Sequence, residues 1–299
     1  MNKQDYSRRD LLKLCGVTAG ASALPATRII AAATASDAEK PVFRFAIASD
    51  FHFGQEETAY RENIPLLVCM LNREKVDRGL DVVFFNGDLV HDSATAYEAL
   101  KANYLSKLKT PYYAIKGNHD YLDGKKASPG ESWERIWGYP RNHVVSMNRL
   151  TFVLADTSAA RRASDYRPAD IAWLRDQLDA HQDEEAIFVF LHIAQRKQGV
   201  QGWPRFGVGR NDNERAKAGE AVMALIESSK NVRAIFHGHD HNSLGRLVSG
   251  GKPYFFDSHI GGSFGNRIGY RIVEMHTDRS MVTYQYDMQD AVIVNKHAL

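Results

Sequence analysis

Cysteine is nearly absent from the 299-residue sequence, which contains only Cys15 and Cys69. Cys15 falls in an amino-terminal segment that we expect to be removed, so the mature chain would keep one cysteine and form no intrachain disulfide. Cys69 lies in the apolar segment 64–71, which is typical of a core-facing helix, and we assign it no chemistry. No internal repeat occurs, and no low-complexity tract lies beyond the amino-terminal segment. The chain is therefore expected to fold around an ordinary hydrophobic core.

A strong charge of either sign is also missing, because the formal net charge is only +2. Residues 1–35 carry a net charge of +3, so the rest of the chain carries −1. Affinity for a phosphate backbone requires clustered cations. We therefore expect no binding to a nucleic acid polymer.

The first 35 residues have the features of a targeting signal rather than of a folded domain. Residues 7–13, with the sequence SRRDLLK, resemble a twin-arginine export signal in which Leu11 replaces the usual phenylalanine. The Ala/Gly-rich segment 14–27 has no run of 18 apolar residues and is too weak for a stable membrane span. Residues 33–35 (ATA) offer a cleavage site. We predict a signal peptide at 1–35, export by the twin-arginine translocation machinery, and a periplasmic or secreted protein without a membrane span; a disordered basic amino terminus is the alternative.

Residues 36–299 are expected to form a single domain in which helices and strands alternate. Apolar periodicity predicts helices at 58–78, 94–107, 168–181 and 214–229, and a hairpin of strands 144–147 and 150–155 turning at Asn148 and Arg149. Strands at 244–248, 254–257, 270–276 and 281–286 follow as an antiparallel run. Irregular segments near 121–141 and 193–212 are predicted cap loops. This order favours an α/β fold, a layered β-sandwich flanked by helices.

Polar residues follow five short apolar runs, at 43–49, 82–87, 112–116, 187–191 and 232–236. These polar residues are Asp50 and His52, then Asp88, then Asn118, His119 and Asp120, then His192, and finally His237, His239, Asp240 and His241. Open α/β sheets bind their ligands at the carboxyl ends of strands. A single Asp or His in such a place is more often a cap or a core residue, but five in one chain are hard to explain by capping.

The residue types indicate metal binding. Asp, Asn and His provide oxygen and nitrogen ligands that suit Mn, Fe, Zn, Ni or Co. Asp50 and His52 are two residues apart, so in an extended segment they face the same way and could chelate one ion. Seven candidate ligands of these types are more than a single ion needs. Two ions that share a carboxylate would use them, and such a pair could activate a bridging hydroxide for in-line attack at phosphorus.

The motifs Asp-x-His, Gly-Asp, Gly-Asn-His-Asp, a lone His and Gly-His-x-His, in this order over 43–241, resemble the calcineurin-like metallophosphoesterase family. The resemblance implies a four-layer α/β/β/α sandwich and two metal ions. It places the ligands as follows: Asp50, His52 and His241 on the first ion, Asp88 bridging, and Asn118, His192 and His239 on the second. It also implies that His119 is an unligated general acid near the leaving oxygen, and that Asp120 orients it.

Two positions indicate which branch of this family the chain resembles. Purple acid phosphatases use Asp-x-Gly in the first motif and a tyrosine three residues after the bridging aspartate, where this chain has His52 and His91. The pattern is more similar to the bacterial class III cyclic-nucleotide phosphodiesterases. The leading hypothesis is an exported dinuclear-metal phosphoesterase that hydrolyses a small phosphodiester, such as a cyclic nucleotide, or a phosphomonoester, by attack of a metal-bridging hydroxide.

Two other classes remain open. A non-catalytic metal-binding or sensing protein has no use for an unligated proton donor such as His119. An amidohydrolase favours His-x-His on the first strand, where this chain has Asp50 and His52.

Substrate contacts are expected from the loops. The candidates are Trp203, Arg205, Phe206 and Arg210 in the second cap loop, Trp133 and Tyr121 in the first, and His91. Surface-loop packing is the alternative for each. His91 and Asp92 could also support the site from behind, and His259 could reach it from a glycine-rich turn, whereas His237 should complete a strand and point away.

Overall fold

The computed structural model describes residues 40–121, 129–158, 163–164, 166–196, 203–204, 207–209, 212–242, 245–256, 258–265 and 267–299. The signal peptide predicted at 1–35 lies outside these residues. Within them, no helix is both long enough and apolar enough to cross a membrane.

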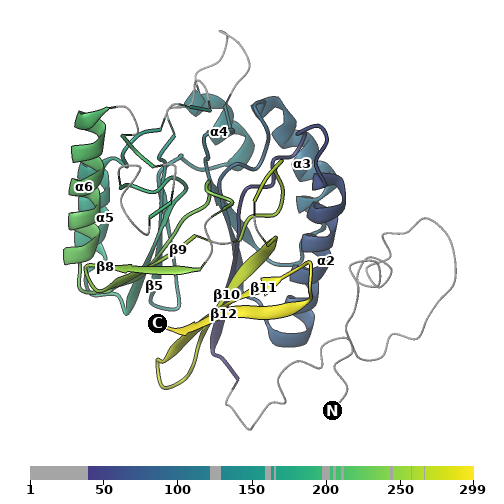
Figure 1. Ribbon diagram of the computed structural model, residues 1–299. Helices are drawn as coiled ribbons and strands as arrows, with labels where there is room; N and C mark the ends of the chain where they lie inside the picture. Colours follow the sequence, from purple (N-terminus) through teal and green to yellow (C-terminus); the bar gives the residue numbers. More distant parts are fainter. Residues whose placement is uncertain are drawn as a thin grey trace, which may run out of the picture.

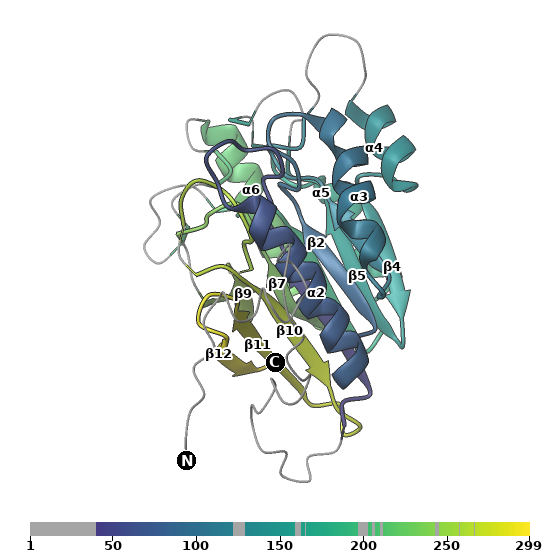
Figure 2. The ribbon, with the colours of Figure 1, turned by 90° about the vertical axis from the view of Figure 1, so that its right-hand side faces the viewer.

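Two six-stranded mixed sheets lie face to face between helices (Figures 1 and 2). The first sheet has the order β12-β11-β10-β1-β2-β3, formed by Val292–Ala298, Met281–Asp287, Gly269–Met275, Phe43–Ala48, Val82–Asn86 and Tyr112–Ile115. The second has the order β4-β5-β6-β7-β9-β8, formed by His143–Met147, Leu150–Ala155, Ala186–Leu191, Val232–Phe236, Lys252–Phe255 and Arg246–Ser249. The four-layer α/β/β/α sandwich is confirmed.

The helices cover the outer faces of the two sheets. Helices α2 (Tyr60–Arg78), α3 (Tyr97–Asn103) and α4 (Pro129–Trp137) pack on the first sheet, and α5 (Ile171–Ala180) and α6 (Asn213–Ser228) pack on the second (Figure 1). The predicted helix 94–107 is broken into α3 and two short 3-10 turns, Ala94–Ala96 and Leu105–Lys107. Helix α5 begins three residues later than predicted, because the Asp170 carboxylate caps the backbone N–H groups of Ala172 and Trp173.

The core between the sheets follows from strand periodicity. In β1, Phe43, Phe45 and Ile47 face the second sheet, while Ala46 and Ala48 face the helices. All six residues of β1 are buried, as expected of a strand with both faces covered. The Phe45 ring lies 4.9–6.3 Å, centroid to centroid, from Phe84 on the adjacent strand and from three rings of the facing sheet: Phe152, Phe188 and Phe236.

Replacing Phe45 with alanine is therefore expected to lower the free energy of unfolding by about 3–5 kcal/mol, because the cavity is enclosed by rigid strands. Urea unfolding in the presence of a chelator measures this without a contribution from bound metal. Val76→Ala on the exposed side of α2 is the control and should change the free energy by less than about 0.5 kcal/mol. A cost for Phe45→Ala below about 1 kcal/mol would contradict this packing.

The hairpin turn falls at the predicted place. Strands β4 and β5 pair with Met147 opposite Leu150, and the intervening Asn148 and Arg149 have φ angles of 52° and 61°. Two positive φ angles in a two-residue loop give the twist that antiparallel strands need.

The antiparallel carboxyl-terminal run is divided between the sheets. The β8–β9 hairpin joins the second sheet, where β9 runs parallel to β7, whereas β10, β11 and β12 form an antiparallel part of the first sheet. Strand β12 was not predicted. It is an edge strand with mostly exposed or half-buried residues, so it has no apolar alternation to detect.

The first predicted cap loop is partly core. Helix α4 lies within 121–141, and its Trp133 is only 1% exposed. The Trp133 ring packs against Trp137 and Tyr97, with centroids 5.1 and 5.8 Å away. The prediction that Trp133 contacts substrate is wrong, because burial beneath α3 removes its ring from solvent.

Candidate metal centre

The loops that follow β1, β2, β6 and β7 meet at one edge of the sandwich. Backbone N–H groups join them directly: Asp50 donates to the Gly87 carbonyl at 2.9 Å, and Gly238 donates to the His192 carbonyl at 3.1 Å. The His239 N–H donates to Asp50 Oδ1 at 3.0 Å. The two sheets are therefore hydrogen-bonded to each other where the predicted ligands emerge.

Four of these ligands have left-handed backbone conformations. The φ angles are 54° at Asp50, 46° at His52, 51° at Asp88 and 69° at His239. Such conformations cost about 1–3 kcal/mol each for residues other than glycine and cluster at functional sites. The folded chain therefore holds these four side chains in place at an energetic cost, as is typical of a functional site.

Glycine is required where these loops touch. A Cβ atom on Gly117 would overlap the backbone nitrogen and the carboxylate of Asp88, and one on Gly238 would overlap Ser49 Oγ and approach Asp50 Oδ2 at 2.6 Å. Any larger residue would push the strand ends apart.

One group of donors consists of Asp50, His52 and His241, all buried, with one ligand atom from each within 4.8 Å of the others. His241 Nε2 lies 3.1 Å from Asp50 Oδ1 and 3.3 Å from His52 Nε2. These are the three residues that the family resemblance assigned to the first ion.

A second group consists of Asp88, His192 and His239, with ligand atoms equally close. His192 Nε2 lies 3.1 Å from Asp88 Oδ2 and 3.2 Å from Asn118 Oδ1. The Asn118 amide nitrogen donates to the Ala163 carbonyl, so its oxygen is the atom turned to the group. Asp88 Oδ2 is also 3.8 Å from His52 Nε2, which places Asp88 between the two groups.

Outer hydrogen bonds orient two of the imidazoles toward the site. His192 Nδ1 lies 2.6 Å from the Asn86 carbonyl oxygen, and His241 Nδ1 lies 3.0 Å from that of Phe264. Because a carbonyl only accepts, Nδ1 carries the hydrogen in each ring, and the lone pair of Nε2 faces the donor group. This is the tautomer that a metal ligand needs.

The charges of the site also suit cations. Burial lowers the pKa of His192, but the carboxylates of Asp88 and Asp50 outweigh it and raise this pKa to about 10. Burial likewise opposes the effect of Asp50 on His241, whose pKa is raised. At His52 and His239 burial dominates and lowers the pKa to about 3. The two buried carboxylates therefore favour positive charge close to these imidazoles, and bound divalent ions would supply that charge. The residues therefore fit a pair of metal ions.

His119 lies beside both groups with a different partner from the one predicted. Its Nδ1 is 2.5 Å from Asp92 Oδ1, and its backbone N–H donates to Asp88 Oδ1 at 2.7 Å. The prediction that Asp120 orients His119 is wrong. The buried Asp120 carboxylate instead accepts backbone N–H groups from Val90 and Gly117 at 2.9 and 2.8 Å, and so ties two loops together. Burial and the nearby Asp88 raise the pKa of Asp120 to about 6.

Two further histidines pack against the ligands. His91 Nδ1 lies 3.0 Å from His52 Nδ1, and its ring stacks on His119 with centroids 4.8 Å apart. His259 stacks on His241, also at 4.8 Å. His237 points away, as predicted: its Nδ1 lies 2.7 Å from the Leu191 carbonyl oxygen, and its ring stacks on Phe256.

A cavity of about 190 Å³ opens over the two groups. The described residues that line it are His52, Gln55, Asp88, His91, His119, Tyr166, His239, His241, Gly262, Ser263 and Phe264. The predicted substrate contact His91 is among them, and Tyr166, Gln55, Ser263 and Phe264 were not predicted. They come from irregular segments with no motif or periodicity that would mark them.

The second cap loop contributes differently from what we predicted. Trp203 packs its ring on Tyr254 and Phe256, with centroids 5.0 and 5.7 Å away, and the Arg196 guanidinium lies over the Trp203 ring, 4.8 Å from its centroid. It is not among the described residues that line the cavity. Arg205, Phe206 and Arg210 lie outside the described residues, so their assignment stays a prediction.

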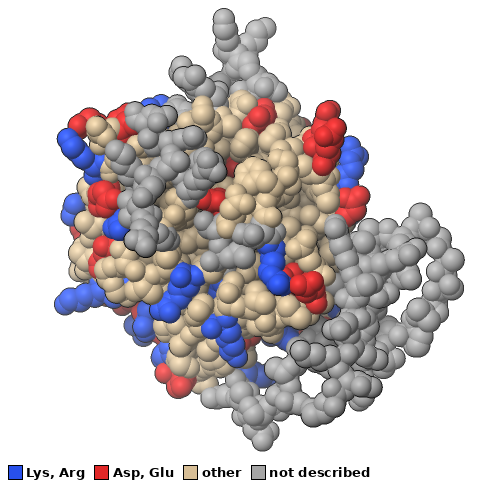
Figure 3. All heavy atoms as spheres, in the orientation of Figure 1, with Lys and Arg blue, Asp and Glu red and all other residues tan. Residues whose placement is uncertain are grey.

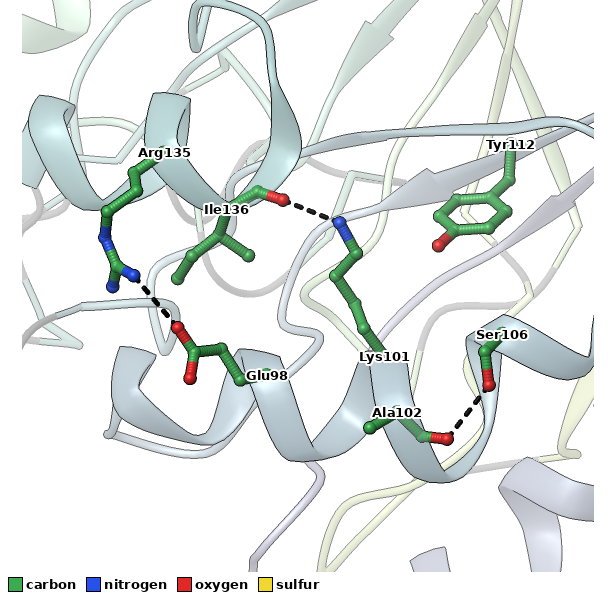
Figure 4. Close-up of a pocket in the computed structure, with 7 residues that line it drawn as sticks. All are labelled: Glu98, Lys101, Ala102, Ser106, Tyr112, Arg135 and Ile136. Atoms are coloured by element: carbon green, nitrogen blue, oxygen red, sulfur yellow. Dashed lines mark hydrogen bonds and ion pairs between the residues drawn. The ribbon is translucent and has the colours of Figure 1, made fainter.

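A larger cavity, of about 400 Å³, lies between α3 and α4 (Figure 4). Its charged side chains are already engaged, since Lys101 Nζ donates to the Ile136 carbonyl at 2.6 Å and Arg135 pairs with Glu98 at 2.9 Å. None of the clustered His, Cys, Asp and Glu groups found in the described part of the chain belongs to it. The chemistry is therefore concentrated in the smaller cavity.

Comparison with known sequences decides the family. The profile of the calcineurin-like phosphoesterases matches residues 43–243, which contain all the donors described above. The chain belongs to this family. The family prediction from the five motifs is confirmed. The described residues of this phosphoesterase include groups of Asp and His side chains that could hold metal ions.

Relatives of this calcineurin-like phosphoesterase include two named as phosphodiesterases. It is 24% identical over 178 residues to a probable glycerophosphodiester phosphodiesterase of Arcobacter nitrofigilis, covering 58% of this chain and 61% of the relative. It is 26% identical over 169 residues to a probable cyclic nucleotide phosphodiesterase of Synechococcus, covering 56% of this chain and 60% of the relative. The chain thus spans about three fifths of the length of these curated relatives.

Solved structures share the fold. A dimetal phosphatase from Danio rerio superposes with a TM-score of 0.61 at 15% identity, over 87% of this chain and 99% of that one. A purple acid phosphatase from yellow lupin seeds superposes with a TM-score of 0.62 at 13% identity, over 87% of this chain and 54% of that one.

Proposed function

We propose that this calcineurin-like phosphoesterase is an exported hydrolase of small phosphodiesters that depends on two metal ions. The observation that carries the proposal is His119, which contacts Asp88 and His52 and is hydrogen-bonded to Asp92. It lies outside the two donor groups that contain a carboxylate, and its own cluster with His52 and His91 consists of imidazoles alone. A site that only stored or sensed metal would have no use for the pair of His119 and Asp92.

The two donor groups would hold one ion each, with Asp88 between them. Bound ions would supply Lewis-acid stabilisation of the phosphoryl oxygens and an activated water nucleophile. The protein supplies the orientation, since the carbonyls of Asn86 and Phe264 fix the rings of His192 and His241.

His119 has the geometry of a general acid. With Nδ1–H directed at Asp92, its Nε2 is the atom that can deliver a proton to the leaving oxygen, and the carboxylate fixes the orientation of the ring. The side chain is 24% exposed, so solvent can restore the proton after each turnover. The ring stacked against His91 is restrained from turning away.

The preference for diesters rests on charge. Among the described residues that line the cavity, none is lysine or arginine, so metal ions and histidines are the cations available to substrate there. A phosphodiester carries one negative charge and a monoester up to two, so the diester needs less compensation. The names of the two sequence relatives point the same way.

The direct test compares bis-p-nitrophenyl phosphate with p-nitrophenyl phosphate on the mature protein reconstituted with manganese. We expect a higher kcat/KM for the diester, and a panel of cyclic nucleotides, glycerophosphodiesters and pyrophosphates then narrows the substrate. A higher value for the monoester would contradict the diester preference. Stoichiometric metal binding with no turnover on the whole panel would favour the non-catalytic metal-binding alternative.

Asp92→Asn is expected to lower kcat about ten- to a hundredfold, less than removal of the acid itself, because a neutral amide is a weaker acceptor for the Nδ1–H that orients the ring for proton donation. The loss should be larger for an alkyl leaving group, which needs a proton, than for p-nitrophenolate, which does not. Asp120→Asn is the matched control: it changes a carboxylate that contacts backbone rather than His119, so its effect should not depend on the leaving group. Equal losses for both leaving groups in Asp92→Asn would contradict this role.

Export is supported by the SRRDLLK motif and the cleavage site that follows it. Replacing Arg8 and Arg9 with lysine should leave the protein in the cytoplasmic fraction of a bacterium that has a twin-arginine system, whereas the unchanged chain should reach the periplasm. Periplasmic accumulation of both would contradict this route.

On the face in Figure 3, Lys and Arg are interspersed with Asp and Glu over the described surface, which supports the expectation of no nucleic acid partner.

A further inference from the structure

Phe264 is an exposed aromatic ring at the mouth of the site. Among the described residues, five large apolar side chains are exposed, and Phe264, at 53%, is the aromatic one. It lies in the segment 261–265, between β9 and β10, and lines the cavity. Single exposed apolar residues are common on protein surfaces, so its position beside the metal ligands, not its exposure alone, requires an explanation.

The segment that carries Phe264 is fixed to the site. The Phe264 carbonyl accepts the hydrogen bond from His241 Nδ1 at 3.0 Å, and its ring stacks on the same imidazole with centroids 4.9 Å apart and planes 27° apart. One residue earlier, Ser263 Oγ accepts from Gln55 Nε2 at 3.2 Å. A ring held this way by both backbone and stacking is presented at a defined place over the cavity.

Two rings separate Phe264 from the general acid. The His119 ring is 4.9 Å from His52, His52 is 5.1 Å from His241, and His241 is 4.9 Å from Phe264, centroid to centroid. In an in-line displacement the leaving group departs opposite the nucleophile, next to the acid that protonates it. A substituent that reaches Phe264 is therefore the one that stays on phosphorus.

We propose that Phe264 determines specificity by stacking on a planar, apolar substituent that phosphorus retains during the reaction. This inference rests on the proposed phosphodiesterase function and refines its substrate class: diesters whose retained group is an aromatic ring or a base. The flat face of such a group gains an offset-stacked contact that a small alkyl group lacks.

The test uses two substrates that differ only in the retained group, p-nitrophenyl phenylphosphonate and p-nitrophenyl methylphosphonate. Both release p-nitrophenol, so a difference in KM between them cannot come from the leaving group. Phe264→Ala is expected to raise KM for the phenyl compound about three- to tenfold, the range of one aromatic pair, and to change the methyl compound much less. Phe264→Leu, which keeps apolar volume without a ring, should recover part of the loss. Val248→Ala, which removes an exposed apolar side chain from β8, should leave the preference unchanged.

A binding measurement separates this inference from the proposed function. Calorimetry on the metal-loaded protein should give a lower Kd for phenylphosphonate than for methylphosphonate, and Phe264→Ala should remove most of the difference while metal content stays the same. Equal changes for both compounds in Phe264→Ala, or no change for either, would overturn the stacking role. Failure of the unmutated protein to hydrolyse either ester would overturn the proposed function, and equal affinities for the two phosphonates would then overturn the stacking role as well.

Discussion

Replacing Asp88 with alanine is expected to abolish tight metal binding and turnover together. Its carboxylate lies between the two donor groups, 3.1 Å from His192 Nε2 and 3.8 Å from His52 Nε2, and it also accepts the His119 N–H. Loss of an outer-shell partner commonly weakens metal binding or activity about 10- to 100-fold, and loss of a shared ligand should exceed this. Elemental analysis after dialysis measures metal per chain, and a diester assay measures turnover.

Asp88→Asn is the matched variant, because it keeps the shape and removes the charge. It should retain fold but bind the ions more weakly than the unchanged protein. Glu98→Gln, in the exposed pair with Arg135, is the surface control and should keep full metal content and activity. Full metal content and normal turnover in Asp88→Ala would exclude a bridging role.

Replacing His119 with alanine is expected to preserve metal content while kcat falls about 10²- to 10⁴-fold for diesters with alkyl leaving groups. The imidazole is in neither metal-ligand set that the family assigns, so its removal leaves both sets complete. The loss should be much smaller with p-nitrophenyl leaving groups, which depart without a proton. Elemental analysis and a leaving-group series measured side by side separate these effects.

The contrast with Asp88→Ala makes the second prediction specific. Simultaneous loss of metal and activity in His119→Ala would place the imidazole among the ligands, and an equal loss for every leaving group would assign it to transition-state charge stabilisation rather than proton donation.

The sequence predicted the metal groups because buried parallel strands are easy to recognise. Strands such as Val82–Asn86 are apolar throughout, so their ends are marked by the first polar residues, and the fold brings those ends to one edge. The pairing within each group followed from the family motifs. The left-handed conformations of Asp50, His52, Asp88 and His239 were not predicted. Asp and His are enriched among non-glycine residues with a positive φ, but such residues are only a few per cent of all, so the residue type alone does not identify them.

The partner of His119 was missed for a physical reason. The family resemblance implied Asp120, but the chain after Asp88 turns back at Asp92, whose φ is 58°, and the Asp92 N–H donates to the His119 carbonyl at 2.9 Å. This contact depends on how two loops pair, which residue patterns do not encode. Phe264 was also not predicted, because it lies in a glycine-rich turn that has no periodicity and is distant in sequence from the metal-binding motifs.

Aromatic residues in irregular segments were the other source of error. Trp133 and Trp203 were expected at the substrate, yet both rings pack into hydrophobic clusters. A tryptophan that caps a cavity and one that anchors a loop look the same in sequence, because both are isolated apolar residues among polar ones. Only the neighbouring strands and helices distinguish them.

Electron paramagnetic resonance during a manganese titration of the mature protein tests the shared carboxylate most directly. We expect two ions per chain and, at saturation, the signal of two exchange-coupled manganese ions, which should disappear in Asp88→Asn. Saturation at one ion per chain, or two ions whose signals remain uncoupled, would contradict a centre in which position 88 joins the two metals.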